Sequence, residues 1–152
     1  MGKRRLAREL ILQALYEIDL RKVDAEEALA HVLGQEDSDI EILNNKGPKY
    51  IKDEDLKIFV SEIVKGTKER FSHIDKIISG YARNWRIERI ARVDLNILRL
   101  AIYEILYRGD IPNTVSIDEA VELGKKYGTD DSSKFINGIL GGLVQSGKCK
   151  EP

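Results

Sequence analysis

The chain has 152 residues, of which 42% are hydrophobic and 34% charged, and its net charge is -1. This composition fits one domain with a real core, or two small subdomains, and excludes a disordered tail or a disulfide-stapled scaffold. The charge excludes a protein that is basic overall, and no apolar run reaches the roughly 18 residues of a membrane span. Acidic residues interrupt the apolar N-terminal stretch and no small-residue cleavage site follows, so we expect a cytoplasmic protein without a signal peptide.

Helical spacing dominates the sequence, and strand alternation is scarce. The first four predicted helices cover residues 4–21, 24–34, 53–70 and 72–80. The second and the fourth begin with the form of a capping box: Asp24 with Glu27, and Ser72 with Asp75. Residues 44–48 (NNKGP), between the second and third helices, carry the strongest loop signal.

The second half of the chain begins at a junction near Trp85, a side chain that we expect to be mostly buried. Residues 87–107 are apolar on nearly every side, which indicates a central helix that is buried all round. A capping box at residues 116–119 (SIDE) predicts the next helix, which ends at Gly128. The last helix begins near Asp131 and carries an apolar stripe at positions 136, 139, 140, 143 and 144. The predicted fold class is therefore all-α, with about seven helices.

The sequence contains no catalytic constellation. Its two histidines lie on different predicted helices, no HExxH or CxxC motif is present, and the single cysteine, Cys149, is close to the end of the chain. The glycine-rich segment near the C-terminus lacks the features of a phosphate loop, so we expect Gly138, Gly141 and Gly142 to let helices approach closely. We therefore expect a protein that is not an enzyme and that holds no metal and no cofactor.

The first predicted helix begins with a basic cluster. Four cations fall within six residues: Lys3, Arg4, Arg5 and Arg8. At about 100° per residue, the three arginines share an arc with Tyr16, away from the apolar stripe of the helix. Arginine binds phosphates and an aromatic ring stacks on bases, so this outward face suits a nucleic acid. The alternative is a solvated surface on which Arg5 pairs with Glu9 and Tyr16 is half-buried.

The last predicted helix begins with a second candidate. Phe135 lies about 110° from the centre of the apolar stripe and is next to Lys134. The pair either contacts RNA where helix N–H groups favour anions, or Phe135 packs against a neighbouring helix. Arginines at positions 83, 86, 89 and 92 surround Trp85 and indicate either an ion-pair surface or a protein-docking surface.

Several segments, in this order, resemble the NusB family of bacterial transcription antitermination factors. They are RRLARE at residues 4–9, LQALY at 12–16, Trp85, Arg89-Ile90, LRLAIYEIL at 98–106, Ile111-Pro112, SIDEAVEL at 116–123, KYG at 126–128 and KFINGIL at 134–140. The resemblance covers nearly the whole chain. It departs from the family pattern at Asp118, where the family often has asparagine, and at Leu95, where it usually has a basic residue.

The resemblance implies a single RNA-binding domain over residues 1–152, with two helical subdomains, about 1–82 and 83–147, that share the central helix. It implies an adaptor that binds single-stranded box A RNA together with NusE, a small-subunit ribosomal protein, in the transcription elongation complex. The residues at RNA-binding positions are Lys3, Arg4, Arg5, Arg8, Tyr16, Lys134 and Phe135. The residues near the partner surface are Glu88, Asp94 and Asp131. A homodimer stays open, because the family contains both monomers and dimers.

Two further functions stay open at this point. Residues 117–145 have the order helix, turn, helix, which resembles a helix-turn-helix DNA-binding regulator. The second helix of that pair offers few basic groups beyond Lys134, and the sequence pI near 6.2 does not favour a standalone duplex binder. The other possibility is a purely structural adaptor between proteins.

Overall fold

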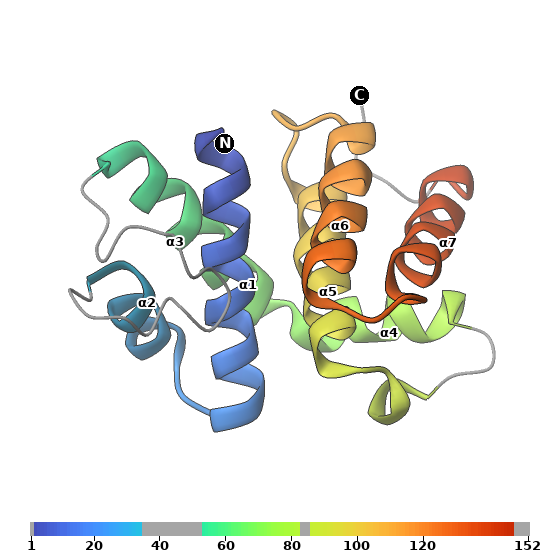
Figure 1. Cartoon of the computed structure of the whole chain (residues 1–152), viewed down its shortest axis with the longest axis horizontal. Coiled ribbons are helices and arrows are strands. Elements are labelled where there is room, and N and C mark those ends of the chain that lie inside the picture. The colour runs from blue at the N-terminus through green and yellow to red at the C-terminus, as the bar shows by residue number, and fades with distance from the viewer. Residues whose placement is uncertain (1, 35–52, 83–85, 148–152) are drawn as a thin grey trace. The chain divides into compact units, whose positions relative to one another are not determined.

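The computed structural model describes residues 2–34, 53–82 and 86–147, and every regular element among them is helical (Figure 1). The all-α prediction is therefore confirmed. The elements are α1 (Lys3–Arg21), α2 (Ala25–Gly34), α3 (Glu54–Glu69), α4 (Phe71–Tyr81), the 3-10 helix η2 (Ile87–Arg89), α5 (Arg92–Tyr107), α6 (Asn113–Tyr127) and α7 (Ser132–Gln145). The loop expected at residues 44–48, the junction at Trp85 with its neighbour Arg83, and Cys149 lie outside the described residues.

The chain divides into two compact units, Met1–Glu69 and Arg70–Pro152. The boundary thus precedes α4, whereas the sequence placed it near residue 82. The physical reason is that α4 packs against α5 and α7 and so belongs to the second unit. The helix expected to be central, α5, also belongs wholly to the second unit.

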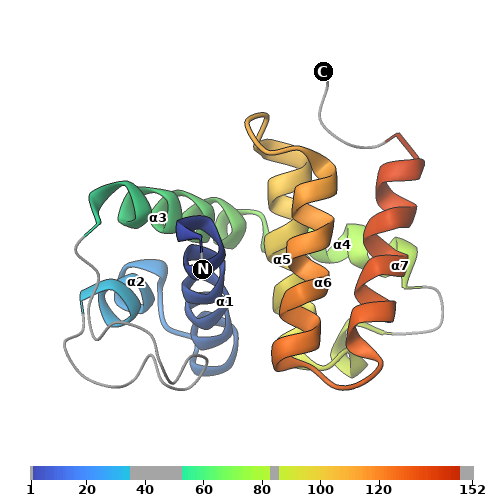
Figure 2. The same ribbon diagram turned by 45° about the horizontal axis from the view of Figure 1, so that its top comes forward.

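In the first unit, α1 packs against both α2 and α3 (Figure 2). Its core is formed by apolar side chains of all three helices, which include Leu10, Ile11, Ala14, Leu15, Ala28, Val32, Val60 and Ile63. Several polar side chains of α1 are also buried: Glu9, Gln13, Glu17 and Asp19. Glu17 is held by His31 of α2, whose Nδ1 lies 2.7 Å from the carboxylate. The sequence predicted one apolar and one outward face for α1, and this was wrong because α1 is buried nearly all round.

In the second unit, α5 packs against α4, α6 and α7, and its buried residues run without interruption from Asp94 to Ile102. The prediction of a helix buried on all sides is confirmed for this part of the chain. The helix does not begin at Ile87, however. A short 3-10 turn ends at Arg89, the backbone is extended through Ile90 and Ala91, and α5 then begins at Arg92.

The helix starts show which capping predictions hold. The Asp24 carboxylate accepts a hydrogen bond from the Glu27 N–H at 2.8 Å, as its capping box predicted. The other two boxes are wrong: α4 already begins at Phe71 and α6 at Asn113. Ser116 therefore lies inside α6, where its hydroxyl donates a 2.7 Å hydrogen bond to the buried Glu104 carboxylate of α5.

The close approach of α6 and α7 depends on Gly124 and not on the glycines near the C-terminus. A Cβ at Gly124 would lie 2.9 Å from Cδ1 of Ile136, and one at Gly128 would collide with the side chain of Ser132. A Cβ at Gly138 or Gly141 would meet no atom of the described chain within 4 Å. The expectation for these two glycines was wrong, because both lie away from the packed face of α7. For Gly142 it is confirmed, since a Cβ there would lie 3.2 Å from Cδ1 of Tyr81 in α4.

Candidate nucleic-acid interface

The first turn of α1 is basic and lacks a side-chain cap. Its N-cap is Gly2, no acidic residue lies in the first turn, and Lys3, Arg4 and Arg5 are all exposed. Cations at this end oppose the helix dipole, so the turn favours an anion beside it. Lys3 forms an ion pair with Asp53 at 2.8 Å, and this hydrogen-bonded contact raises the pKa of Lys3 and lowers the pKa of Asp53.

Two arginines of this cluster face the ring of Phe59 in α3. The guanidinium carbon of Arg4 lies 4.0 Å from the ring centroid and that of Arg8 lies 5.9 Å from it. Arg8 is only 4% exposed, so its expected place on an outward face was wrong. The cause is α3, which brings an aromatic ring against the arc that the sequence assigned to solvent. Tyr16, on the same arc, is half-buried.

The start of α7 has a defined turn before it. The Thr129 N–H donates a 2.9 Å hydrogen bond to the buried Ser132 hydroxyl, and Asp131 occupies the N-cap position with its side chain exposed. One turn later, Lys134 is exposed and Phe135 is half-buried. The two side chains line different pockets on either flank of α7.

The pocket beside Phe135 has a volume of about 290 Å³. It is lined by Arg89, Ile90, Asp94, Thr129, Asp131 and Phe135, among others. Three residues predicted from family positions, Asp94, Asp131 and Phe135, therefore meet at one place. Glu88 is exposed on η2 and does not line this pocket. A half-buried ring between an arginine and two carboxylates offers both stacking and hydrogen bonding to a ligand.

Asp94 is less available than the sequence suggested. Asp94 is only 8% exposed. This burial raises the pKa of its carboxyl group, although a hydrogen bond with Ser132 acts to lower that pKa. The Oδ1 atom has no hydrogen-bond partner among the described residues. Asp94 thus links the start of α5 to the start of α7 and presents little charge at the surface.

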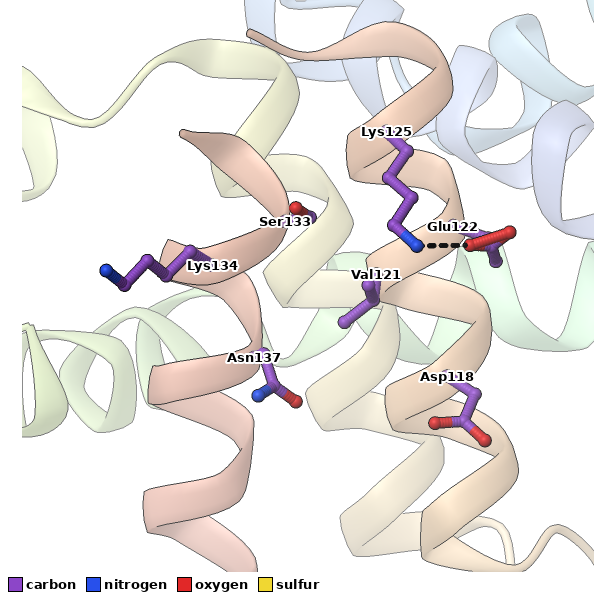
Figure 3. A pocket seen from close by; sticks show the side chains of 7 residues that line it. All are labelled: Asp118, Val121, Glu122, Lys125, Ser133, Lys134 and Asn137. Carbon is purple, nitrogen blue, oxygen red and sulfur yellow. Dashed lines mark ion pairs between the residues drawn. The ribbon is translucent and has the colours of Figure 1, made fainter. Parts of the chain in front are cut away.

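A second pocket, of about 520 Å³, lies between α6 and α7 on the flank that carries Lys134 (Figure 3). The α6 wall consists of Asp118, Val121, Glu122 and Lys125, which recur at helical spacing along one face. The α7 wall consists of Ser133, Lys134 and Asn137. Sequence reasoning missed Asp118 and Asn137 as site residues. They meet only because α6 and α7 pack together, and neither helix alone signals this.

The same two helices were the basis of the helix-turn-helix alternative. In Figures 1 and 2, α6 and α7 lie side by side and run in opposite directions along most of their length. A helix-turn-helix motif instead sets its helices at about 90–120°. The structure therefore does not support this alternative.

Two further properties hold for residues 2–34, 53–82 and 86–147. None of their helices is long and apolar enough to cross a membrane. Among the same residues, no group of three or more His, Cys, Asp or Glu side chains is arranged to hold a metal ion.

The comparisons with known proteins give one consistent result. Residues 5–145 match the NusB family. The transcription antitermination protein NusB of Myxococcus xanthus is 43% identical over 140 residues, which cover 92% of this chain and 93% of that protein. The protein of the same name from Geobacter sulfurreducens is 44% identical over 140 residues, covering 92% of each.

Solved structures agree with this family. T. maritima NusB has a TM-score of 0.79 and 36% identity, and the match covers 95% of this chain and 92% of that chain. A crystal structure of the antitermination factors NusB and NusE in complex with dsRNA contains a chain with a TM-score of 0.78 and 27% identity, covering 96% of this chain and 98% of that one. The family match and the curated relatives extend over more than nine-tenths of the sequence, and this chain therefore belongs to the NusB family.

Proposed function

We propose that this chain is an RNA-binding adaptor in transcription antitermination, which binds single-stranded box A RNA together with NusE. Its family membership supports a role in this process, since the curated relatives described above are transcription antitermination proteins. The similar chain in a complex of NusB, NusE and dsRNA supports both RNA and NusE as partners. Through NusE, the adaptor would join the elongation complex in the cytoplasm, and it needs no catalytic group for this role.

The observation that carries the proposal is the start of α7, where an exposed cation and an aromatic ring stand next to each other in the chain. Lys134 is exposed and suits a phosphate, and Phe135 borders a pocket and has a ring suited to stacking on a base. Such a pair fits a flexible single strand better than a duplex, because only unpaired bases expose their faces for stacking.

The first turn of α1 supports the same function within its own unit. Lys3, Arg4 and Arg5 form an exposed basic turn that suits the phosphates of a nucleic acid. We assign Arg8 and Tyr16 a supporting position, since one is buried and the other half-buried. For NusE, the exposed carboxylates Glu88 and Asp131 are the proposed contacts, and Asp94 acts by holding the start of α7.

The test is a binding titration on the full chain with three labelled nucleic acids of one sequence: single-stranded box A RNA, the same RNA as a duplex, and duplex DNA. We expect single-stranded RNA to bind tightest, more tightly still when NusE is present, and with an affinity that falls as salt rises. A preference for duplex DNA would overturn the proposal, as would the absence of RNA binding both with and without NusE. Sedimentation of the same samples gives the oligomeric state of the free and bound protein.

A further inference from the structure

The pocket between α6 and α7 has hydrogen-bonding groups that the described chain does not use. Asp118, Asn137 and Lys134 line it, all three are exposed, and none of their side chains has a hydrogen bond or an ion pair with another described residue. Glu122 and Lys125, by contrast, pair with each other at 3.3 Å. Val121 and Ser133, which are half-buried, form the less exposed part of the pocket lining. Its volume of about 520 Å³ is within the range of small-ligand sites.

The polar groups are separated along the length of this pocket. Lys125, Ser133 and Lys134 lie towards the turn that joins the two helices, whereas Asp118 lies seven residues before Lys125, roughly 10 Å away along α6. In Figure 3, Asn137 and Asp118 project from opposite walls at the end away from Lys125. One end is therefore suited to a phosphate, and the other to a group that donates hydrogen bonds.

The end with Asp118 and Asn137 matches one nucleobase better than the others. The Asp118 carboxylate offers two acceptors, and the amide of Asn137 offers a donor from the opposite wall. The Watson–Crick edge of guanine presents the complement: two donors, N1–H and the N2 amino group, and one acceptor, O6. The same edge of adenine, cytosine or uracil presents only one donor position, so each of these bases can form two such hydrogen bonds where guanine can form three.

The geometry points to a guanine subsite between α6 and α7, in which Asp118 and Asn137 hold the base edge and Lys125 meets the phosphate. This inference rests on the proposed RNA binding and names the base that one part of the surface selects. Two cations and two carboxylates line the pocket, so its net charge is zero. It therefore contributes discrimination between bases, while the basic turn of α1 and the Lys134–Phe135 pair contribute affinity.

The experiment uses the full chain, in the presence of NusE if NusE is needed for binding, and labelled uridine 12-mers that differ at one central position. The central residue is guanosine, inosine, adenosine or uridine. We expect the guanosine oligonucleotide to bind roughly tenfold more tightly than those with adenosine or uridine, since a bidentate base contact gives discrimination of this order. Inosine, which lacks the N2 amino group, should fall between them.

Two variants test the assignment, and a third is the matched control. Asp118→Ala and Asn137→Ala should each reduce the preference for guanosine to about twofold or less, while binding of the all-uridine strand stays within about twofold of wild type. Asp130→Asn removes an exposed carboxylate that does not line the pocket, so it should leave the preference intact. All three positions are exposed, and thermal unfolding of each variant checks that the fold is retained.

The outcomes separate this inference from the function on which it rests. If RNA binds but guanosine and inosine bind no better than adenosine, or if Asp118→Ala keeps the full preference, the guanine subsite is wrong and the RNA-binding function stands. If Asp118→Ala weakens only NusE binding, the pocket belongs to a protein partner and the inference is also overturned. If no RNA binds under any condition, both fail.

Discussion

At the start of α1, the ring that meets the cations comes from another helix, whereas at the start of α7 the ring and the cation are neighbours in the sequence. Phe59 of α3 faces both Arg4 and Arg8, and Arg8 is thereby buried inside its own unit. Phe135 is only half-buried and borders a pocket, while Lys134 is exposed. Cations near an aromatic residue in the sequence therefore point to a candidate binding surface at the start of a helix. The packing of the other helices decides which of these side chains are exposed to a ligand.

The largest expected effect concerns Arg8, the buried member of the α1 cluster. Arg8→Ala should lower the free energy of unfolding by about 2–3 kcal/mol, because it removes a desolvated cation–π contact and the packing of a long side chain. Urea unfolding at pH 7 measures the loss. Arg5→Ala is the matched control and should change stability by less than about 0.5 kcal/mol. Equal stability of the two variants would contradict the internal role of Arg8.

The second effect concerns Phe135, the half-buried ring at the start of α7. Phe135→Ala should weaken RNA binding roughly 10- to 100-fold, because a base–aromatic stack is worth about 1–3 kcal/mol. Its free energy of unfolding should fall by less than about 1.5 kcal/mol, since the ring is half-buried and lies off the buried stripe of α7. A fully buried phenylalanine would instead cost about 3–5 kcal/mol. A large loss of stability with unchanged affinity of the folded fraction would show that Phe135 is a core residue.

A third, smaller effect should come from Arg5, an exposed arginine in the first turn of α1. Arg5→Ala should weaken RNA binding several-fold and lower the slope of log affinity against log salt by about 0.7, the value of one phosphate contact on a single strand. Titrations at four salt concentrations give the slope. Arg108→Ala is a useful control in the other unit, because that arginine pairs with Asp110 at 2.9 Å and is not part of either proposed RNA contact. An unchanged slope for Arg5→Ala would reduce the basic turn to a solvated surface.

The smallest effect concerns Asp94, which joins α5 to the start of α7. Burial raises the pKa of its carboxyl, so the charged form is disfavoured in the folded protein. The resulting penalty is present in full above the folded pKa and is relieved as the pH falls through that pKa. Asp94→Asn should therefore raise the free energy of unfolding at pH 7 by up to about 1 kcal/mol.

The pH dependence provides the check on Asp94. The difference between wild type and Asp94→Asn should shrink as the pH falls from 7 towards the ordinary value near 3.8. Urea unfolding at several pH values in this interval measures it. A difference that grows at low pH would mean that the ionised carboxylate stabilises the fold through its contact with Ser132.

Much of the fold follows from the sequence because helical periodicity is a local property. The apolar stripe of α7 was predicted from spacing alone, and Ile136, Ile139, Leu140 and Leu143 are all buried. The α5 segment is apolar on nearly every side, and this pattern predicted a helix buried on all sides. In α7 the buried positions after Ser132 belong to the apolar stripe, whereas α5 also buries Asn96, Arg99 and Glu104, whose polarity alone would not predict burial.

The remaining features depend on contacts between segments. The sequence of α1 does not show that Glu17 is buried, because His31 of α2 supplies its partner from fourteen residues away. Ser116 has the pattern of an N-cap, but its hydroxyl bonds Glu104 of α5 and the helix begins earlier. The candidate site residues show the same dependence on contacts between segments. Lys134 and Phe135 were predicted from one helix, whereas Asp118 and Asn137 share a pocket only through the packing of two.

The two ends of α1 differ in a way that has a consequence for motion. At its C-terminus, Lys22 adopts the left-handed conformation with φ of 59° and its N–H bonds the Ile18 carbonyl, while Arg21 matches the helix dipole. At its N-terminus, no side chain caps the first turn and the cations oppose the dipole. Local opening should therefore start at this end, and its amide protons should exchange with solvent fastest in the helix. A phosphate bound there would accept hydrogen bonds from the same N–H groups. RNA binding would therefore slow the exchange of these amide protons and cap the first turn of the helix.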